Sequence, residues 1–310
     1  MTDTQFDPMD DPQLFDFEVP PPISLADKFG VPPMSVLDCR MGDWQNRKRR
    51  WLSIGMESEV GRAEDLLYTR ASATDPVSLK LLDAGGTSIF DPVLCELAYR
   101  WHTRPGDRVL DPFAGGSVRG IVASTLARWY VGVDLRPEQV TANRAQARLG
   151  SDIEPRWIQG DSTELYDHLD GTDEFDLIFS CPPYADLEVY SDDPRDLSRM
   201  AYDDFRATHA QIIQAATSRL RPDRFAVWVI SDVRDKRGAY RGLVSHTIEA
   251  FKAAGLSFHN DAVILNATAT AGLRAERPFR STRKLTRVHQ HMLVFVKGDA
   301  HRAAMRLESP

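Results

Sequence analysis

The chain has 310 residues, of which 42% are hydrophobic and 27% are charged, and its net charge is −7. This ordinary globular composition suits one large domain with appendages or two modest domains. The three cysteines have no CxxC spacing, so we expect neither a disulfide framework nor a metal site. No apolar run is long enough to span a membrane, and no signal-peptide core is present, so we predict a cytoplasmic protein without a membrane partner.

Charge is unevenly distributed along the chain. Residues 1–26 carry six acidic side chains and no Lys or Arg, whereas basic residues concentrate at 47–50 and at 274–287. Because binding to a polyanion depends on local charge, the negative net charge does not exclude a nucleic-acid partner. We predict an acidic disordered tail at 1–30, an N-terminal extension at 31–88, one main domain at 89–298 and a C-terminal tail at 299–310.

From residue 89 the sequence alternates strand and helix patterns, which predicts a mostly parallel α/β sheet. The expected helices are 92–101, 117–128, 137–149, 202–220 and 245–254. The expected strands are 108–110, 130–133, 156–158, 175–180, 225–231, 257–265 and 291–296, with a long basic loop joining the last two. A basic helix is also expected at 44–53, within the extension.

Acidic residues and glycines follow the first three of these strands. Asp111 opens a glycine loop between a strand and a helix, and Asp134 and Asp161 follow the next two strands. Open parallel sheets bind ligands at the carboxyl ends of their strands, and glycines let the backbone approach a ligand closely. We therefore predict a cofactor site in which Asp134 accepts hydrogen bonds from a ribose diol and Asp161 holds an adenine amino group. An NAD site is the alternative, but GxGxxG is absent; for Asp134 alone, the alternative is a helix cap.

A Pro-Pro-aromatic element follows the fourth strand and consists of Ser180, Cys181, Pro182, Pro183 and Tyr184. Two prolines fix φ and remove backbone donors, so the local carbonyls form a rigid set of acceptors. The aromatic ring suits stacking on a planar base. Together these features predict a pocket for the amino group of a base drawn out of its helix.

These elements resemble those of the amino-directed DNA methyltransferases, which make N6-methyladenine or N4-methylcytosine. The family's glycine loop is similar to the segment that contains Asp111, Phe113, Gly115 and Gly116, and its catalytic tetrapeptide is similar to residues 181–184. The segment 88–92, with Phe90, resembles the element that lines the methionine end of the cofactor. The resemblance covers about residues 88–298, and the order of the elements excludes the group in which they are reversed.

The resemblance implies a Rossmann-like class I methyltransferase sheet with an antiparallel last strand, S-adenosylmethionine as cofactor and duplex DNA with a flipped base as partner. It implies catalysis without a metal. Residues 33–38, 44–61 and 186–190 further resemble DNA methylases encoded by actinobacterial phages, which implies a bacterial or phage-infected cytoplasm.

Cys181 departs from the family pattern, which has Asp, Asn or Ser at this position. A thiol is a weak donor and acceptor, and Cys is closest in shape to Ser, the variant associated with transfer to N4 of cytosine. We therefore favour N4 of cytosine over N6 of adenine. The alternative is C5 methylation of cytosine, with Cys181 as nucleophile and Glu188 as the group that protonates N3.

Two basic clusters are candidates for contact with DNA phosphates. Their members are Arg47, Lys48, Arg49 and Arg50, flanked by Trp44 and Trp51, and Arg277, Arg280, Arg283 and Lys284, within the basic loop. Segments 31–88 and 266–288 are our candidates for target recognition. The alternative functions are methylation of RNA and a non-catalytic DNA-binding regulator, and the sequence is compatible with a monomer or a homodimer.

Overall fold

The computed structural model describes residues 24–57, 90–187, 189–266 and 271–308. The chain divides into two compact units after Pro33. The described part of the first unit holds one short helix, α1 (Leu25–Phe29), which is capped where Ser24 Oγ accepts a hydrogen bond from the Asp27 N–H. This helix lies within the segment predicted to be an acidic tail, and residues 1–23 of that tail lie outside the described residues.

Eight strands in the described part of the second unit form one sheet, in the order β1-β7-β8-β6-β5-β2-β3-β4. Only β8 runs antiparallel to its neighbours. The predicted Rossmann-like sheet with an antiparallel last strand is therefore confirmed. The strands are β1 (Val36–Asp38), β2 (Arg108–Asp111), β3 (Trp129–Asp134), β4 (Arg156–Gln159), β5 (Phe175–Ser180), β6 (Leu220–Ile230), β7 (Ser257–Leu265) and β8 (His289–Lys297).

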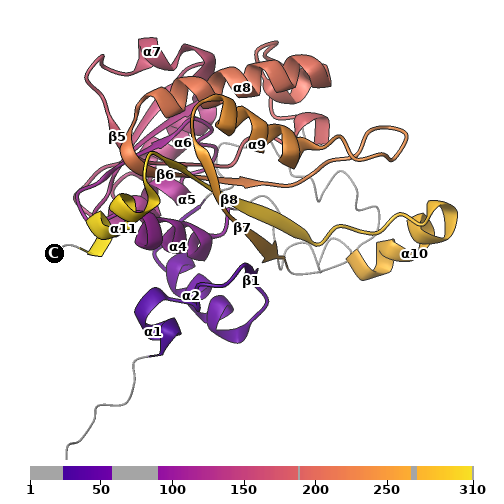
Figure 1. Cartoon of the computed structure of the whole chain (residues 1–310), viewed down its shortest axis with the longest axis horizontal. Helices are drawn as coiled ribbons and strands as arrows, with labels where there is room; N and C mark the ends of the chain where they lie inside the picture. The colour runs from indigo at the N-terminus through magenta and orange to yellow at the C-terminus, as the bar shows by residue number, and fades with distance from the viewer. Residues whose placement is uncertain (1–23, 58–89, 188, 267–270, 309–310) are drawn as a thin grey trace, which may run out of the picture. The chain divides into compact units, whose positions relative to one another are not determined.

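Helices cover both faces of this sheet, and Figure 1 shows α8 and α9 on one face and α4 on the other. Every residue of β5 is buried, as expected for a central parallel strand covered on both sides. The α-helices of this unit are α2 (Gly42–Leu52), α4 (Pro92–His102), α5 (Val118–Thr125), α6 (Pro137–Ala145), α7 (Leu165–His168), α8 (Tyr202–Ser218), α9 (Leu243–Ala253), α10 (Ala271–Thr282) and α11 (Ala300–Glu308).

Three segments differ from the sequence predictions. The basic loop expected between the last two strands contains α10, even though Pro278 lies inside that helix. An i,i+4 ion pair between Glu276 and Arg280 supports its helical form. Residues expected to form a C-terminal tail instead form α11, and the N-terminal extension contributes β1, which pairs with β7 as the edge strand of the sheet.

The strand directions place the connecting segments at one edge of the sheet. Because β8 is antiparallel to both β6 and β7, these two strands point the same way as β5 and β2. The segments that follow β2, β3, β5, β6 and β7 therefore share the carboxyl edge. Helix α10 follows β7, and in Figure 1 it extends away from the sheet.

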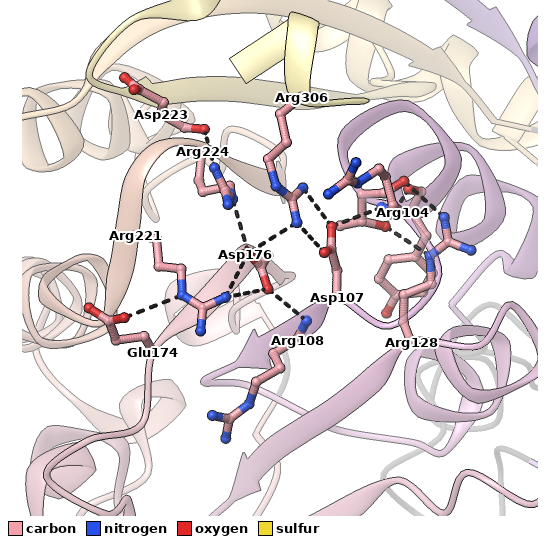
Figure 2. Close-up of polar contacts among 12 residues, drawn as sticks. Arg104, Asp107, Arg108, Arg128, Glu174, Asp176, Arg221, Asp223, Arg224 and Arg306 are labelled. Carbon is pink, nitrogen blue, oxygen red and sulfur yellow. Dashed lines mark hydrogen bonds and ion pairs between the residues drawn. The ribbon is translucent and has the colours of Figure 1, made fainter. Parts of the chain in front are cut away.

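An ion-pair network closes the opposite, amino edge of the sheet (Figure 2). Asp176, which is 2% exposed, accepts hydrogen bonds from the Arg108 N–H at 3.1 Å and from the guanidinium groups of Arg221 and Arg224, each at 3.0 Å. Arg306 of α11 reaches both Asp176 and Asp107. Burial opposes the charge of Asp176, but these donors lower its pKa below the ordinary value. The network therefore fastens α11 to the amino edge of the sheet.

Candidate active site

A hydrogen bond joins the two sequence motifs. Asp111 ends β2 and Ser180 ends the neighbouring strand β5, and both side chains are fully buried. Ser180 Oγ donates to Asp111 Oδ1 at 2.5 Å. The Phe113 N–H donates to the same two side chains, at 3.1 Å to Asp111 and 3.2 Å to Ser180. The glycine loop and the Pro-Pro-Tyr element are thus held in one fixed relationship.

The second oxygen of Asp111 is held by two further side chains. Arg119 Nε donates to Asp111 Oδ2 at 2.5 Å, and the Tyr130 hydroxyl donates to it at 2.7 Å. Burial opposes the charge of Arg119, but Asp111 raises its pKa above the usual range. Arg119 also donates to the carbonyls of Phe113 and Ala114, so one guanidinium braces the glycine loop from below.

Arg119 was not identified from the sequence. The available signal was a charged residue within the apolar run Val118–Ser124, since a buried charge requires a partner. With its carboxylate saturated by internal donors, Asp111 is a structural anchor of the loop, and a direct ligand contact through its side chain is not open to it. The same holds for the hydroxyl of Ser180.

The glycine loop bends where Gly115 adopts a φ of +51°, which favours a residue without a Cβ. Asp134 Oδ2 accepts a hydrogen bond from the Gly115 N–H at 2.9 Å, and Asn143 Nδ2 donates to the Gly115 carbonyl at 2.7 Å. Beneath the loop, a Cβ on Gly132 would lie 2.8 Å from the Cβ of Ala114. The half-buried Gly116 follows directly and leads to the start of α5.

The two acids predicted to bind the nucleoside lie at neighbouring strand ends. Asp134 is half-buried, and burial raises its pKa, although the N–H groups of Arg136 and Gly115 oppose that rise. Asp161 caps a short 3-10 helix through Oδ1, which accepts from Thr163. Its Oδ2 has no hydrogen-bond partner among the described residues. A bent glycine loop flanked by these carboxylates fits a ligand with a ribose diol and an amino-bearing base.

Phe90 precedes α4 and lies close to Phe179 and Arg119. Its ring contacts Phe179 of β5 edge-on, with 5.7 Å between centroids, and the Arg119 guanidinium lies 4.6 Å from its centre. The half-buried ring therefore faces the same buried arginine that braces the loop. This position agrees with a lining role at the cofactor site, and residues 88 and 89 lie outside the described residues.

The Pro-Pro-Tyr element carries a short chain of polar contacts. Cys181 Sγ lies 3.5 Å from the Tyr184 hydroxyl, which donates to Gln290 Oε1 on β8 at 3.4 Å. Pro182 is buried, whereas Cys181, Pro183 and Tyr184 are half-buried. The sequence did not indicate Gln290, because nothing in it predicts that the start of β8 lies close to the segment that follows β5. Glu188, proposed as a proton donor for C5 chemistry, lies outside the described residues.

The first predicted DNA-binding cluster lies on α2, and half of its charge is already paired. Arg47 forms an ion pair with Glu96 at 2.7 Å, and Lys48 forms one with Asp91 at 3.3 Å. Trp44 and Trp51, which flank this cluster in the sequence, are 3% and 9% exposed, so their rings are buried and do not form part of the exposed surface of the helix. They bury the apolar side of α2, while Arg49 and Arg50 remain exposed.

The second predicted cluster is exposed. Arg277, Arg280, Arg283 and Lys284 all lie on or just after α10, at the carboxyl edge. Arg280 pairs with Glu276, and the Arg283 guanidinium lies 5.3 Å from the centre of the Phe279 ring. In the part of the chain that the structure describes, no group of three or more His, Cys, Asp or Glu side chains is arranged to hold a metal ion, and no helix has the length and apolar character needed to cross a membrane.

Comparison with known proteins finds similar segments in two bacterial enzymes. Type II methyltransferase M.XycI of Xanthomonas campestris pv. cyanopsidis is 44% identical over 61 residues, which is 19% of this chain and 20% of the relative. Type II methyltransferase M.Cfr9I of Citrobacter freundii is 40% identical over 63 residues, 20% of this chain and 17% of the relative. The chain thus spans about a fifth of the length of the curated relatives that it matches. No protein-family model matches the chain.

Solved structures are similar over a larger share of the chain. TrmN from Thermus thermophilus aligns with a TM-score of 0.46 and 19% identity, covering 73% of this chain and 55% of that protein. A TehB-like SAM-dependent methyltransferase from Corynebacterium glutamicum aligns with a TM-score of 0.42 and 19% identity, covering 71% of this chain and 94% of that protein. The similarity to type II methyltransferases is thus confined to short stretches of sequence.

Proposed function

We propose that this protein is an S-adenosylmethionine-dependent methyltransferase that acts on a base in duplex DNA. The observation that carries the proposal is the hydrogen bond between Ser180 and Asp111, which locks a glycine loop and a Pro-Pro-Tyr element together at adjacent strand ends. A cofactor loop and a base pocket must be neighbours for a methyl group to pass between them. The short similarities to type II methyltransferases support the same activity.

The cofactor would lie along the loops that follow β2, β3 and β4. Asp134 would accept hydrogen bonds from the ribose hydroxyls and Asp161 would accept one from the adenine amino group, while Gly115 and Gly116 would allow close approach of the backbone. Phe90 would line the methionine end. When bound, S-adenosylmethionine supplies an electrophilic methyl group on a sulfonium.

The target would be an exocyclic amino group, and we favour N4 of cytosine over N6 of adenine. The carbonyls beside Pro182 and Pro183 would accept the amino hydrogens, which orients the nitrogen lone pair, and the ring of Tyr184 would stack on the base. Ser180 would hold the element in place through the hydrogen bond from its hydroxyl to Asp111. The half-buried Cys181 occupies the position of the family's Asp, Asn or Ser.

Cytosine C5 transfer is the second candidate, because a cysteine lies at the start of the pocket element. A C5 enzyme forms a covalent bond between a thiolate and C6 of the ring, which requires an activated thiol. Cys181 Sγ lies 3.5 Å from the Tyr184 hydroxyl, and the thiol also interacts electrostatically with the Arg119 guanidinium. We favour amino transfer because the glycine loop and the Pro-Pro-Tyr element resemble those of the amino-directed methyltransferases.

The exposed cations of α10 would contact the DNA backbone from the carboxyl edge, and Arg49 and Arg50 would add contacts from α2. We test the function by measuring tritium transfer from labelled S-adenosylmethionine to plasmid DNA and to total RNA. Transfer to DNA alone supports the proposal, transfer to RNA alone establishes an RNA methyltransferase, and DNA binding without transfer identifies a non-catalytic regulator. A matched Asp134→Ala variant should reduce transfer to background.

A further inference from the structure

A short hairpin, Val233–Arg241, follows β6 at the carboxyl edge of the sheet. Arg234 and Tyr240 form an antiparallel bridge, and the Arg241 N–H donates to the Val233 carbonyl at 2.9 Å. At its tip, Asp235 Oδ1 accepts hydrogen bonds from the N–H groups of Arg237 and Ala239, each at 2.9 Å. The backbone hydrogen bonds between its two arms, together with those to Asp235 in the turn, hold this hairpin in one conformation.

The hairpin lies beside the proposed base pocket. Arg241 forms an ion pair with Asp186 at 3.0 Å, and Asp186 is only two residues after Tyr184. The two segments enclose a hollow of about 290 Å³, whose lining includes Leu187, Arg234 and Lys236. The hairpin and the segment that follows Tyr184 thus line one hollow beside the proposed base pocket.

Tyr240 is exposed on this hairpin, and two guanidinium groups lie near its ring. Its side chain is 46% exposed, the Arg234 guanidinium carbon lies 3.7 Å from the ring centre, and that of Arg287 lies at 5.5 Å. Arg234 donates a hydrogen bond to the Gly238 carbonyl, and Arg287 donates one to the His289 carbonyl. Among the described residues, neither arginine has a carboxylate partner. An exposed aromatic ring beside two arginines without carboxylate partners suits a nucleic acid, because the ring can stack on a base and the arginines can bind phosphates.

We propose that Tyr240 inserts into the DNA stack beside the target base, with Arg234 and Arg287 binding the flanking phosphates. This inference rests on the proposed function and adds to it the element that fills the gap left by the extruded base. A base that leaves the duplex exposes the faces of its neighbours, and an inserted side chain compensates for that lost stacking. The rigid hairpin keeps the ring ready for insertion.

The chain contains a matched control pair at the opposite edge. Tyr166 is 53% exposed and lies under the Arg219 guanidinium at 5.1 Å. Its hydroxyl donates to Ser218 at the end of α8, next to the start of β6. The same chemistry therefore occurs where no base can arrive, so replacing Tyr166 controls for the loss of an exposed tyrosine–arginine contact.

The test measures fluorescence anisotropy of a mixed-sequence DNA duplex and of the same duplex with one abasic position. We expect the wild type and Tyr240→Phe to bind the abasic duplex about tenfold more tightly, because an aromatic ring can fill the vacant position. Tyr240→Ala should lose this preference while its affinity for the intact duplex changes less than about twofold, and Tyr166→Ala should behave as the wild type.

Three results would overturn the inference: no abasic preference in the wild type, an unchanged preference in Tyr240→Ala, or equal weakening of both duplexes in that variant. Methyl transfer to plasmid DNA by the wild type is measured in parallel. Absence of transfer with an intact abasic preference would refute the proposed function and leave the inserting role of Tyr240 standing. Methyl transfer without a preference for the abasic duplex would support the proposed function and refute the inserting role of Tyr240.

Discussion

Ser180 Oγ lies 2.5 Å from Asp111 Oδ1, and through this hydrogen bond the ends of β5 and β2 share one buried carboxylate. The same carboxylate also receives Arg119 and Tyr130. The conformation of the proposed cofactor loop and that of the proposed base pocket therefore depend on each other. A change on one side of this contact should be detected on the other.

Ser180→Ala tests that dependence. Removing the hydroxyl leaves a buried acceptor and the Phe113 N–H with fewer partners, at a cost of about 1–3 kcal/mol. We expect a loss of unfolding free energy of this order and weaker binding of S-adenosylmethionine in calorimetry. Ser124→Ala is the control, because Ser124 is equally buried and bonds to the Ile153 carbonyl, away from the loop. An equal loss of cofactor affinity in both variants would contradict the coupling.

Cofactor binding should weaken in acid because of Asp134. Its pKa is raised above 3.8 by burial, and only the carboxylate accepts hydrogen bonds at both oxygens. Without cofactor, a raised carboxyl pKa stabilises the folded state at low pH, and this contribution falls as the pH rises through that pKa. Affinity should therefore rise with pH over the same range in the wild type. In Asp134→Asn it should be lower and nearly independent of pH over that range; an unchanged pH profile would exclude Asp134 as the titrating group.

The chemistry at Cys181 is tested by Cys181→Ser. If the thiol stands in for a serine, the variant should retain or increase methyl transfer. Cys95→Ser is the matched control, because Cys95 is buried in α4. Complete loss in Cys181→Ser, with a covalent complex between the wild type and 5-fluorocytosine DNA, would establish C5 attack instead.

The cations of α10 should set the salt dependence of DNA binding. Arg277→Ala with Arg283→Ala removes two exposed charges, so the slope of log K against log salt should fall by up to about 2. Arg148→Ala with Lys252→Ala is the control, because these exposed cations lie at the ends of helices that lead back to the amino edge. Equal slopes for the two double variants would place the DNA elsewhere.

The ion-pair network at the amino edge should contribute stability and no specificity. Asp176→Asn leaves the guanidinium groups of Arg221, Arg224 and Arg306 without their shared carboxylate, which should cost about 3–5 kcal/mol in urea unfolding. Because the pKa of Asp176 is lowered in the folded state, Asp176 stabilises the fold at pH values above the ordinary carboxyl pKa. This stabilisation is lost as the pH falls through the lowered pKa. Asp192→Asn, in an exposed pair with Arg199, should leave the unfolding midpoint unchanged. A small effect of Asp176→Asn would show that the arginines find other partners.

The sequence predicted the central strands and the positions of the loops that follow them because apolar runs such as β5 end at Asp, Gly and Pro signals. It could not predict which way Ser180 points, since a strand buried on both faces has no alternation to reveal it. Helix α10 was missed because Pro278 and Gly272 are typical of loops. Strand β1 has three residues and gains its pairing only from β7, which is distant in the sequence.

Nucleoside mass spectrometry of DNA from cells that express the protein tests the central claim most directly, with the Asp134→Ala variant as the control. We predict N4-methylcytosine in DNA with the wild type and none with the variant. If 5-methylcytosine were the sole methylated base in the DNA, that result would contradict amino transfer. No methylated base in DNA, with or without a new modification in RNA, would contradict the assignment of this protein as a DNA methyltransferase.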